Sequence, residues 1–341
     1  MGYLRNGLEV LRPANQLRGS SMPFPPLLQK LVLPIIGSPL FIISDPELLI
    51  EQCKAGIVGS LPALNARPAE LLEDWLAEIK ETLTAYDRRN PERPAAPFAI
   101  NQIVHKSNDR LERDLELCVK HQVPIIITSL GARSEVNEAV HRYGGIVLHD
   151  VINNTFAHKA IEKGADGIIA VAAGAGGHAG TVNPFALIQE IREWFNGPLA
   201  LSGAIATGRA VLAAQIMGAD FAYIGSAFIA TAEARAAKSY KQMIVDSTSQ
   251  DIVYSNFFTG VHGNYLRASI MNAGFDPEHL PQSDPSMMNF GAVTNETVKV
   301  WKDIWGSGQG IGAIKQVVTV AELVKRLRRE YLAAKLEICG A

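Results

Sequence analysis

Short apolar runs alternate with longer amphipathic segments along most of this chain. Runs of four to six residues rich in Val, Ile and Leu, bounded by glycine, proline or polar residues, are typical of strands buried on both faces of a parallel sheet. Such runs predict eight strands, at residues 31–36, 56–59, 97–101, 124–128, 145–149, 166–171, 198–202 and 221–224.

The segments between these runs have helical spacing. Between residues 70 and 86, apolar side chains recur three or four positions apart, at Leu72, Leu76, Ile79 and Leu83. Similar patterns predict helices at residues 110–120, 157–163, 208–217 and 313–334. Regular alternation of strand and helix indicates βαβ units and therefore a parallel sheet.

Eight strands in this alternation predict an α/β fold, a closed (β/α)8 TIM barrel. The main competitor is a doubly wound sheet, which usually carries its glycine-rich turn after the first strand. Here the glycine clusters follow late strands, which favours the barrel. After the eighth strand the pattern becomes polar and interrupted, so we expect a helical insertion or lid at residues 231–304. Residues 1–30 are expected to be an N-terminal extension, and residues 31–230 and 305–341 the barrel.

Composition narrows the class of protein. With 48% hydrophobic and 19% charged residues, the chain is expected to bury a large core. A net charge of -2 argues against partners such as nucleic acid or an anionic membrane. The three cysteines, Cys53, Cys118 and Cys339, lie far apart, which favours reduced thiols over a metal site. No apolar run approaches the roughly 18 residues that span a bilayer. We therefore expect a cytoplasmic protein, a monomer or homodimer, without a metal.

The most unusual segment is Gly174-Ala175-Gly176-Gly177-His178-Ala179-Gly180, directly after the sixth strand. Ordering four glycines costs backbone entropy, so we expect them to admit a planar ligand close to the backbone. His178 is the segment's only titratable side chain. In a barrel, the loops after the strands build the active site, so His178 is a candidate general acid or base. The alternative is a histidine with a purely structural role.

Two further loops have the character of a phosphate site. Ser202, Gly203 and Ala204 follow the seventh strand, and Gly225 and Ser226 follow the eighth. Glycine lets backbone N–H groups approach phosphate oxygens, and an adjacent helix N-terminus favours the anion. The spacing of both loops predicts one phosphate-binding site.

Other polar residues end strands at the same side of the predicted barrel. Asn101 ends the third strand, where its amide could bond the edge of a ligand ring or cap the chain. His149 and Asp150 end the fifth. Asp150 could face the cofactor, orient His149 or cap the next helix. Gln309 lies in a glycine-rich turn before the last helix and could reach the phosphate or the ring.

Three of these segments together resemble the nitronate monooxygenase family, formerly the 2-nitropropane dioxygenases, and the related flavin-dependent enoyl-acyl-carrier-protein reductases. The segments are residues 176–180, 201–209 and 218–228, and the resemblance spans about residues 30 to 320. It implies an FMN cofactor and a catalytic histidine at His178. It implies that the phosphate is held by Ser202, Gly203, Gly225 and Ser226. It places the flavin ring near Gly37, Ser38, Pro39, Asn101 and Asp150, with Gly177, Ala204 and Gln309 as further cofactor contacts.

The chain departs from the family pattern at three positions. Ala204 stands where a second glycine is common, which adds a methyl group beside the phosphate loop. The first loop reads Gly37-Ser38-Pro39 where two glycines and a methionine are common, and Pro39 has no N–H to donate. Asp150 stands where a lysine is common. An anion in place of that cation would disfavour an anionic reduced flavin.

The resemblance implies FMN-dependent oxidation of alkyl nitronates by O2 to a carbonyl compound and nitrite. His178 would hydrogen-bond the nitro oxygens, or remove the α-proton of a neutral nitroalkane. One alternative is an NAD(P)H-dependent reductase of a quinone or enoyl thioester on the same barrel. Another is a non-catalytic sensor of a phosphate ligand. The insertion is expected to shape the substrate site, with Tyr254, His262 and Tyr265 as candidate lining residues.

Overall fold

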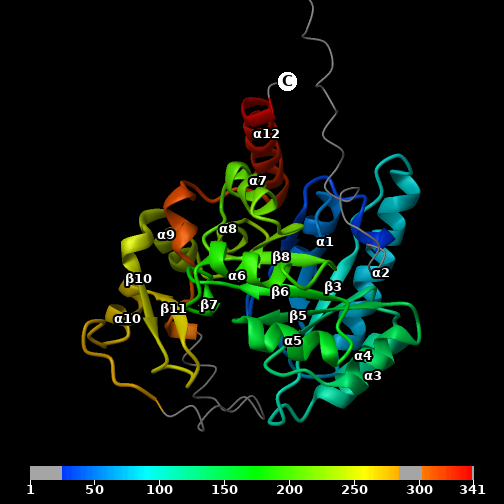
Figure 1. Ribbon diagram of the computed structural model, residues 1–341, viewed down its shortest axis with the longest axis horizontal. Coiled ribbons are helices and arrows are strands. Elements are labelled where there is room, and N and C mark those ends of the chain that lie inside the picture. The colour runs from blue at the N-terminus through cyan, green and yellow to red at the C-terminus, as the bar shows by residue number, and fades with distance from the viewer. Residues whose placement is uncertain (1–24, 284–301, 340–341) are drawn as a thin grey trace, which may run out of the picture.

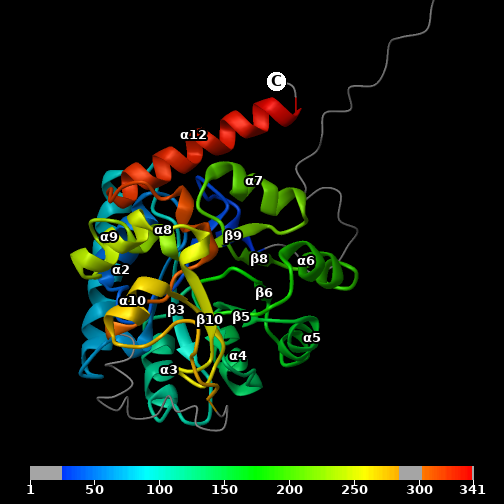
Figure 2. The ribbon, with the colours of Figure 1, turned by 90° about the vertical axis from the view of Figure 1, so that its left-hand side faces the viewer.

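The computed structural model describes residues 25–283 and 302–339. Its main sheet has eight strands in the order β1-β9-β8-β6-β5-β4-β3-β2, and all neighbours pair in parallel. The strands are β1 (Ile35–Gly37), β2 (Gly59–Pro62), β3 (Phe98–Ile103), β4 (Ile125–Ser129), β5 (Ile146–Val151), β6 (Gly167–Val171), β8 (Leu199–Ser202) and β9 (Phe221–Ile224). They lie at the centre of the molecule (Figure 2).

The sheet closes on itself between its first two strands. Ile36 of β1 forms a parallel bridge with Val58, just before β2. The N–H of Gly37 donates to the carbonyl of Val58 over 2.8 Å, and the N–H of Val58 donates to the carbonyl of Ile35 over 3.1 Å. The predicted TIM barrel is therefore confirmed. The second strand starts at Gly59, three residues later than expected, because Gly56, with a φ of +88°, belongs to the turn that ends the preceding helix.

Strand alternation decides which side chains enter the barrel. On β4, Ile125 and Ile127 belong to the interior cluster, whereas Ile126 packs outward against the helices. Leu148 of β5 also faces inward. Leu28, from the expected N-terminal extension, is buried in the same interior cluster. Residues 1–24 of that extension lie outside the described residues.

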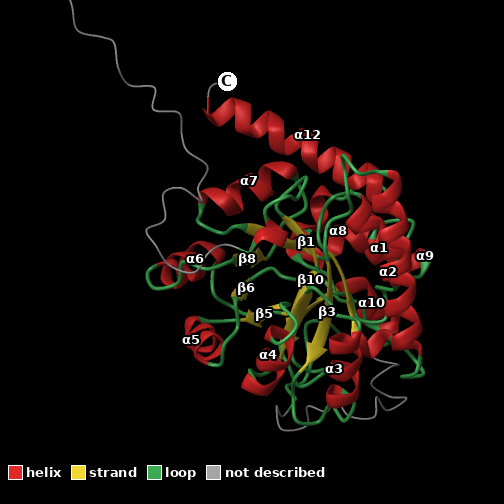
Figure 3. Ribbon diagram, turned by 90° about the vertical axis from the view of Figure 1, so that its right-hand side faces the viewer, coloured by secondary structure: helices red, strands yellow, loops and turns green. Residues whose placement is uncertain are grey.

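Helices surround the strands on the outside (Figure 3). They include α1 (Pro46–Lys54), α2 (Leu71–Arg89), α3 (Leu111–Lys120), α4 (Ser134–His141), α5 (Asn154–Glu162), α6 (Pro184–Arg192), α7 (Gly208–Ile216) and α12 (Val320–Cys339). The last helix begins at Val320 rather than at residue 313. Thr319 and Glu322 cap each other's backbone N–H groups there, over 3.2 and 2.9 Å, which fixes the start. In the described residues, no helix is long and apolar enough to cross a membrane.

The insertion, residues 231–304, contains strands as well as the expected helices. Its described elements are α9 (Lys238–Asp246), η4 (Ser249–Asp251), β10 (Ile252–Ser255), β11 (Gly263–Leu266) and α10 (Arg267–Asn272). β11 pairs antiparallel with β10 and also with β7 (Gly177–His178), which belongs to the glycine-rich segment after β6. In Figure 1 this small sheet lies at one side of the barrel. The two strands were not predicted from the sequence.

Candidate active site

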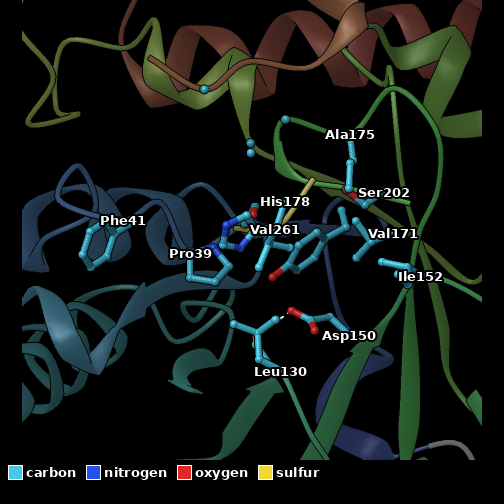
Figure 4. Close-up of a pocket in the computed structure, with 18 of the residues that line it drawn as sticks. Pro39, Phe41, Leu130, Asp150, Ile152, Val171, Ala175, His178, Ser202 and Val261 are labelled. Carbon is cyan, nitrogen blue, oxygen red and sulfur yellow. Dashed lines mark hydrogen bonds between the residues drawn. The ribbon is translucent and has the colours of Figure 1, made fainter. Parts of the chain in front are cut away.

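The loops that follow the barrel strands line a cavity of about 1260 Å³. This volume exceeds the range of about 300–1,000 Å³ that is usual for small-molecule pockets. Figure 4 shows His178 and Asp150 in this cavity, with Pro39, Leu130 and Val171 near them. The predicted site residues that line it are Ser38, Pro39, Asn101, Asp150, Gly177, His178, Ser202, Gly203, Ala204, Gly225 and Ser226.

Gly37 and Gln309 are the predicted contacts that the structure does not bring to the cavity wall. Gly37 pairs within the barrel, and a Cβ there would lie 2.5 Å from Nε2 of Gln52. The Gln52 side chain of α1 thus occupies the space that a side chain at position 37 would need. Gln309 is exposed, and its backbone N–H donates to the carbonyl of Gly174 over 2.9 Å. A role for either residue in cofactor binding stays a prediction.

His178 lies on β7 and is half-buried. Its Nε2 lies 3.1 Å from Oγ1 of Thr259, which belongs to the insertion. Burial disfavours the charged imidazolium and lowers the pKa of His178 to about 4. The imidazole is therefore neutral at physiological pH, and it can exchange hydrogen bonds without introducing a charge.

The glycines around His178 allow protein segments to approach each other closely. Gly174 and Gly177 have φ values of +85° and +65°, in the region that favours glycine. A Cβ on Gly176 would lie 2.7 Å from the backbone nitrogen of Gly308. A Cβ on Gly263 of β11 would lie 2.7 Å from the carbonyl oxygen of Gly177. Contacts within the protein are thus one reason for these glycines, and the close approach of a planar ligand stays a prediction.

Asp150 is the penultimate residue of β5 and lies two residues after the inward-facing Leu148. The Ser129 hydroxyl donates to Oδ2 of Asp150 over 2.5 Å, and Nδ2 of Asn101 donates to the Ser129 oxygen over 2.8 Å. Burial raises the pKa of Asp150 to about 6, although the Ser129 hydrogen bond opposes the shift. A carboxyl group with this pKa changes its charge near neutral pH.

Of the three roles considered for Asp150, the contacts favour the one that faces the cavity. Asn153, not Asp150, caps α5, because its side chain accepts from the N–H of Phe156 over 2.9 Å. His149 pairs with a different residue, Thr128, whose Oγ1 lies 2.6 Å from Nδ1 of the imidazole. Burial lowers the pKa of His149 to about 4.

Three residues of the site were missed from the sequence: Ser129, Tyr223 and Thr259. Tyr223 of β9 lines the cavity and shares a side-chain hydrogen bond with Ser38. Burial raises the pKa of Tyr223, and the charge of Asp150 raises it further. Strand alternation could have found Ser129 and Tyr223, because each lies two positions after a residue that faces the barrel interior. No comparable signal marks Thr259.

The two predicted phosphate loops lie side by side, because β8 and β9 are neighbours. Gly203 has a φ of +146°, and a Cβ there would lie 2.8 Å from the carbonyl oxygen of Ala173. Ala204 adopts a φ of +55°, which is unusual for a residue with a side chain. Ser226 accepts a hydrogen bond from the N–H of Gly308 over 2.9 Å. Hydroxyl groups and glycine backbone at one end of the cavity suit phosphate oxygens.

The insertion contributes an aromatic wall. Tyr254 and His262 line the cavity with their rings stacked 5.1 Å apart, and the Tyr254 hydroxyl donates to the carbonyl of Ala179 over 3.0 Å. Tyr265 is fully buried outside the cavity lining and packs edge-on against Phe258, at 5.2 Å between ring centres. Two of the three candidate lining residues are thus in the wall. A largely apolar cavity with hydroxyl groups and glycine backbone at one end has the character of a nucleotide site.

Comparison with known proteins identifies the family and the fold of this chain. The model of the nitronate monooxygenase family matches residues 28–330. The nitronate monooxygenase of Paraburkholderia phytofirmans is 24% identical, over 87% of this chain and 92% of that protein. Nitroalkane oxidase from Streptomyces ansochromogenes has the same fold, with a TM-score of 0.77 and 21% identity over 91% of this chain and 99% of that one. FabK from Thermotoga maritima has a TM-score of 0.74 and 22% identity, over 92% and 97% of the two chains.

The two solved structures establish the fold alone, since both are less than 25% identical to this chain. The family assignment depends on the match to the family itself, which leaves out only short segments at the two ends. This chain belongs to the nitronate monooxygenase family and is an oxidoreductase.

Proposed function

We propose that this protein uses FMN and dioxygen to oxidise alkyl nitronates to carbonyl compounds and nitrite. The carbon gains an oxygen atom, the C–N bond breaks, and its electron pair leaves with nitrite. In the net balance, two nitronates and one dioxygen give two carbonyl compounds and two nitrite ions. The observation that carries the proposal is the position of His178 in the cavity at the mouth of a barrel of this family.

The two loops after β8 and β9 would hold the FMN phosphate. Their hydroxyl and backbone donors come from Ser202, Gly203, Gly225 and Ser226, which all line the same cavity. The flavin ring would lie near Pro39 and the Asn101–Ser129–Asp150 group, with Ser38 and Gly177 as further contacts. When bound, a flavin supplies a two-electron acceptor that the side chains themselves lack.

The protonation state of His178 favours a nitronate over a neutral nitroalkane. A histidine with a pKa of about 4 is a weak base, poorly suited to removing a proton from carbon. A nitronate has already lost that proton and carries a negative charge. A bound anion favours the imidazolium form, so His178 can take up a proton and pair with the nitro oxygens.

The test is a trace of oxygen consumption by the purified protein. We expect a flavin absorption spectrum, and oxygen uptake with nitrite release when propane-2-nitronate is added. The same concentration of neutral 2-nitropropane should react more slowly. A flavin-loaded protein that consumes no oxygen with nitronate at any of several pH values would refute the proposal.

The size of the cavity favours a second candidate, an NAD(P)H-dependent reductase of a quinone or enoyl thioester. A cavity of about 1260 Å³, with Phe257 and Phe258 in its wall, has room for a bulky apolar substrate. Anaerobic mixing with NADH or NADPH separates the two candidates. Rapid bleaching of the flavin would support the reductase, and slow bleaching would support nitronate oxidation.

A further inference from the structure

A hydroxyl group from the insertion connects His178 to a buried hydrogen-bond network. Thr259 lies between β10 and β11, and its Oγ1 is 3.1 Å from Nε2 of His178. The same Oγ1 lies 3.0 Å from the carbonyl oxygen of Val261 and 3.4 Å from the hydroxyl of Tyr265. The N–H of Val261 donates to this oxygen as well, over 3.4 Å. Four groups therefore meet at one oxygen that has only one proton to donate.

The chemistry of these partners settles where that proton goes. The carbonyl of Val261 can only accept a hydrogen bond, so the Thr259 proton satisfies it. The Thr259 oxygen then serves as an acceptor, and the imidazole nitrogen facing it must be the donor. The other lone pair faces two groups at 3.4 Å, the Val261 N–H, which can only donate, and the Tyr265 hydroxyl.

We infer that Thr259 is a positioning residue that fixes neutral His178 as the tautomer with hydrogen on Nε2. This inference depends on the proposed function only in taking His178 as the catalytic histidine. In this tautomer Nδ1 carries the lone pair. Nδ1 is therefore the nitrogen that would take up a proton when an anionic substrate binds, while Nε2 keeps its hydrogen bond to Thr259.

The surroundings hold this arrangement in place. His178 pairs in register with Gly263, so the strand that carries the imidazole is fixed to the insertion. Tyr265 is fully buried and packs against Phe258. The N–H of Ala179 donates to the carbonyl of His262 over 3.1 Å, which adds a second backbone connection beside the histidine. Thr259 thus reaches His178 from a segment that is paired with β7, the strand of the histidine.

The test is ¹⁵N NMR of the full-length protein labelled at histidine, because ring nitrogen shifts distinguish the two tautomers. His178→Ala identifies the signals of His178. We expect the wild type to show the Nε2–H form, and Thr259→Val, which keeps the volume but removes the acceptor, to show a mixture. Thr259→Ser should restore the wild-type form. The kcat/KM for nitronate should fall about tenfold in Thr259→Val, as for the loss of one hydrogen bond to a reacting group.

Thr248→Val is the matched control. Thr248 is an exposed threonine of the insertion whose hydroxyl caps η4, and its loss weakens the insertion without touching His178. Its spectrum should match the wild type. An Nδ1–H form in the wild type would overturn the inference, even if Thr259→Val failed to fold, and so would an unchanged tautomer in a folded Thr259→Val. Both results are obtained without substrate, so they stand apart from the outcome of the oxygen assay.

Discussion

Asp150 carries a negative charge where burial makes that charge unfavourable. The loss of water around its carboxyl group raises the pKa, and the hydrogen bond from Ser129 lowers it by less. The protein retains a carboxyl group here at a cost to stability. Such a cost is usual where a side chain serves a reaction rather than the fold.

Replacing Asp150 by Asn should therefore stabilise the protein in a pH-dependent way. The native carboxyl group has a pKa of about 6 against an ordinary value of 3.8, so its ionisation destabilises the native state progressively as the pH rises through this interval. Above pH 6 the full cost applies, and Asp150→Asn should raise the free energy of unfolding by about 2–3 kcal/mol. Below pH 4 the difference should vanish. Urea unfolding of the flavin-free protein below pH 4 and above pH 6 measures this difference in the free energy of unfolding. An equal gain at both pH values would contradict ionisation of Asp150 as its cause.

Removing the imidazole of His178 should separate catalysis from cofactor binding. We expect His178→Ala to lower kcat/KM for nitronate by about 10²–10⁴-fold, the usual contribution of a positioned proton-transfer group. FMN should still bind, because the phosphate loops after β8 and β9 are unchanged. The measurements are oxygen uptake and flavin content. His141→Ala, on α4 outside the cavity lining, is the control and should keep full activity.

At the scale of elements, the barrel strands could be predicted from the sequence because each carries its own signal. A strand buried on both faces is a continuous apolar run whatever its neighbours are. Once the strands are located, the polar residues that end them become candidate site residues, because a barrel brings the carboxyl ends of its strands together. β7 has only two residues, Gly177 and His178, and its pairing depends on β11, which lies far along the chain. No local pattern encodes such a pairing, so the sequence predicted neither this strand nor the contact with Thr259.

Residues 307 and 308 pack closely against Gly176, two residues before His178, so Gly176 should tolerate substitution poorly. A Cβ on Gly176 would lie 2.7 Å from the nitrogen of Gly308 and 3.0 Å from the carbonyl carbon of Ser307, both backbone atoms that cannot turn away. Gly176→Ala should lower the free energy of unfolding by about 1–3 kcal/mol, as overpacking does. Gly312→Ala is the control, four residues after Gly308. A Cβ on Gly312 would have no neighbour nearer than 3.9 Å, so this change should have little effect on the free energy of unfolding. Equal denaturation midpoints for both variants would show that the segment can adjust.

At the scale of the whole molecule, the cavity is built from segments distributed over most of the chain. Ser38 follows the first barrel strand, and Gly308 and Gly310 lie just before the last helix. A ligand that contacts so many segments binds only the folded protein. Cofactor binding and global stability are therefore linked.

Adding FMN to the flavin-free protein should raise its melting temperature. At a concentration one hundred times the Kd, the linkage contributes about 2.7 kcal/mol, which is about 4 °C for a chain of this size. Riboflavin, which lacks the phosphate, should give a smaller shift at the same concentration, because Ser202 and Ser226 would have no phosphate to hold. Scanning calorimetry measures both shifts. Equal shifts would mean that these loops do not bind a phosphate.

The pairing of β7 with β11 limits how the substrate site can be redesigned. The segment that lines the aromatic wall also bonds to the strand of the histidine and carries Gly263, whose lack of a side chain permits that bonding. A graft of the insertion from a relative would therefore exchange the specificity wall and the support of His178 together. Chimaeras that transfer new substrate preferences should keep Thr259 and residues 263–264 of this chain, which support His178. They should vary only the residues between β10 and β11 that do not contact the histidine.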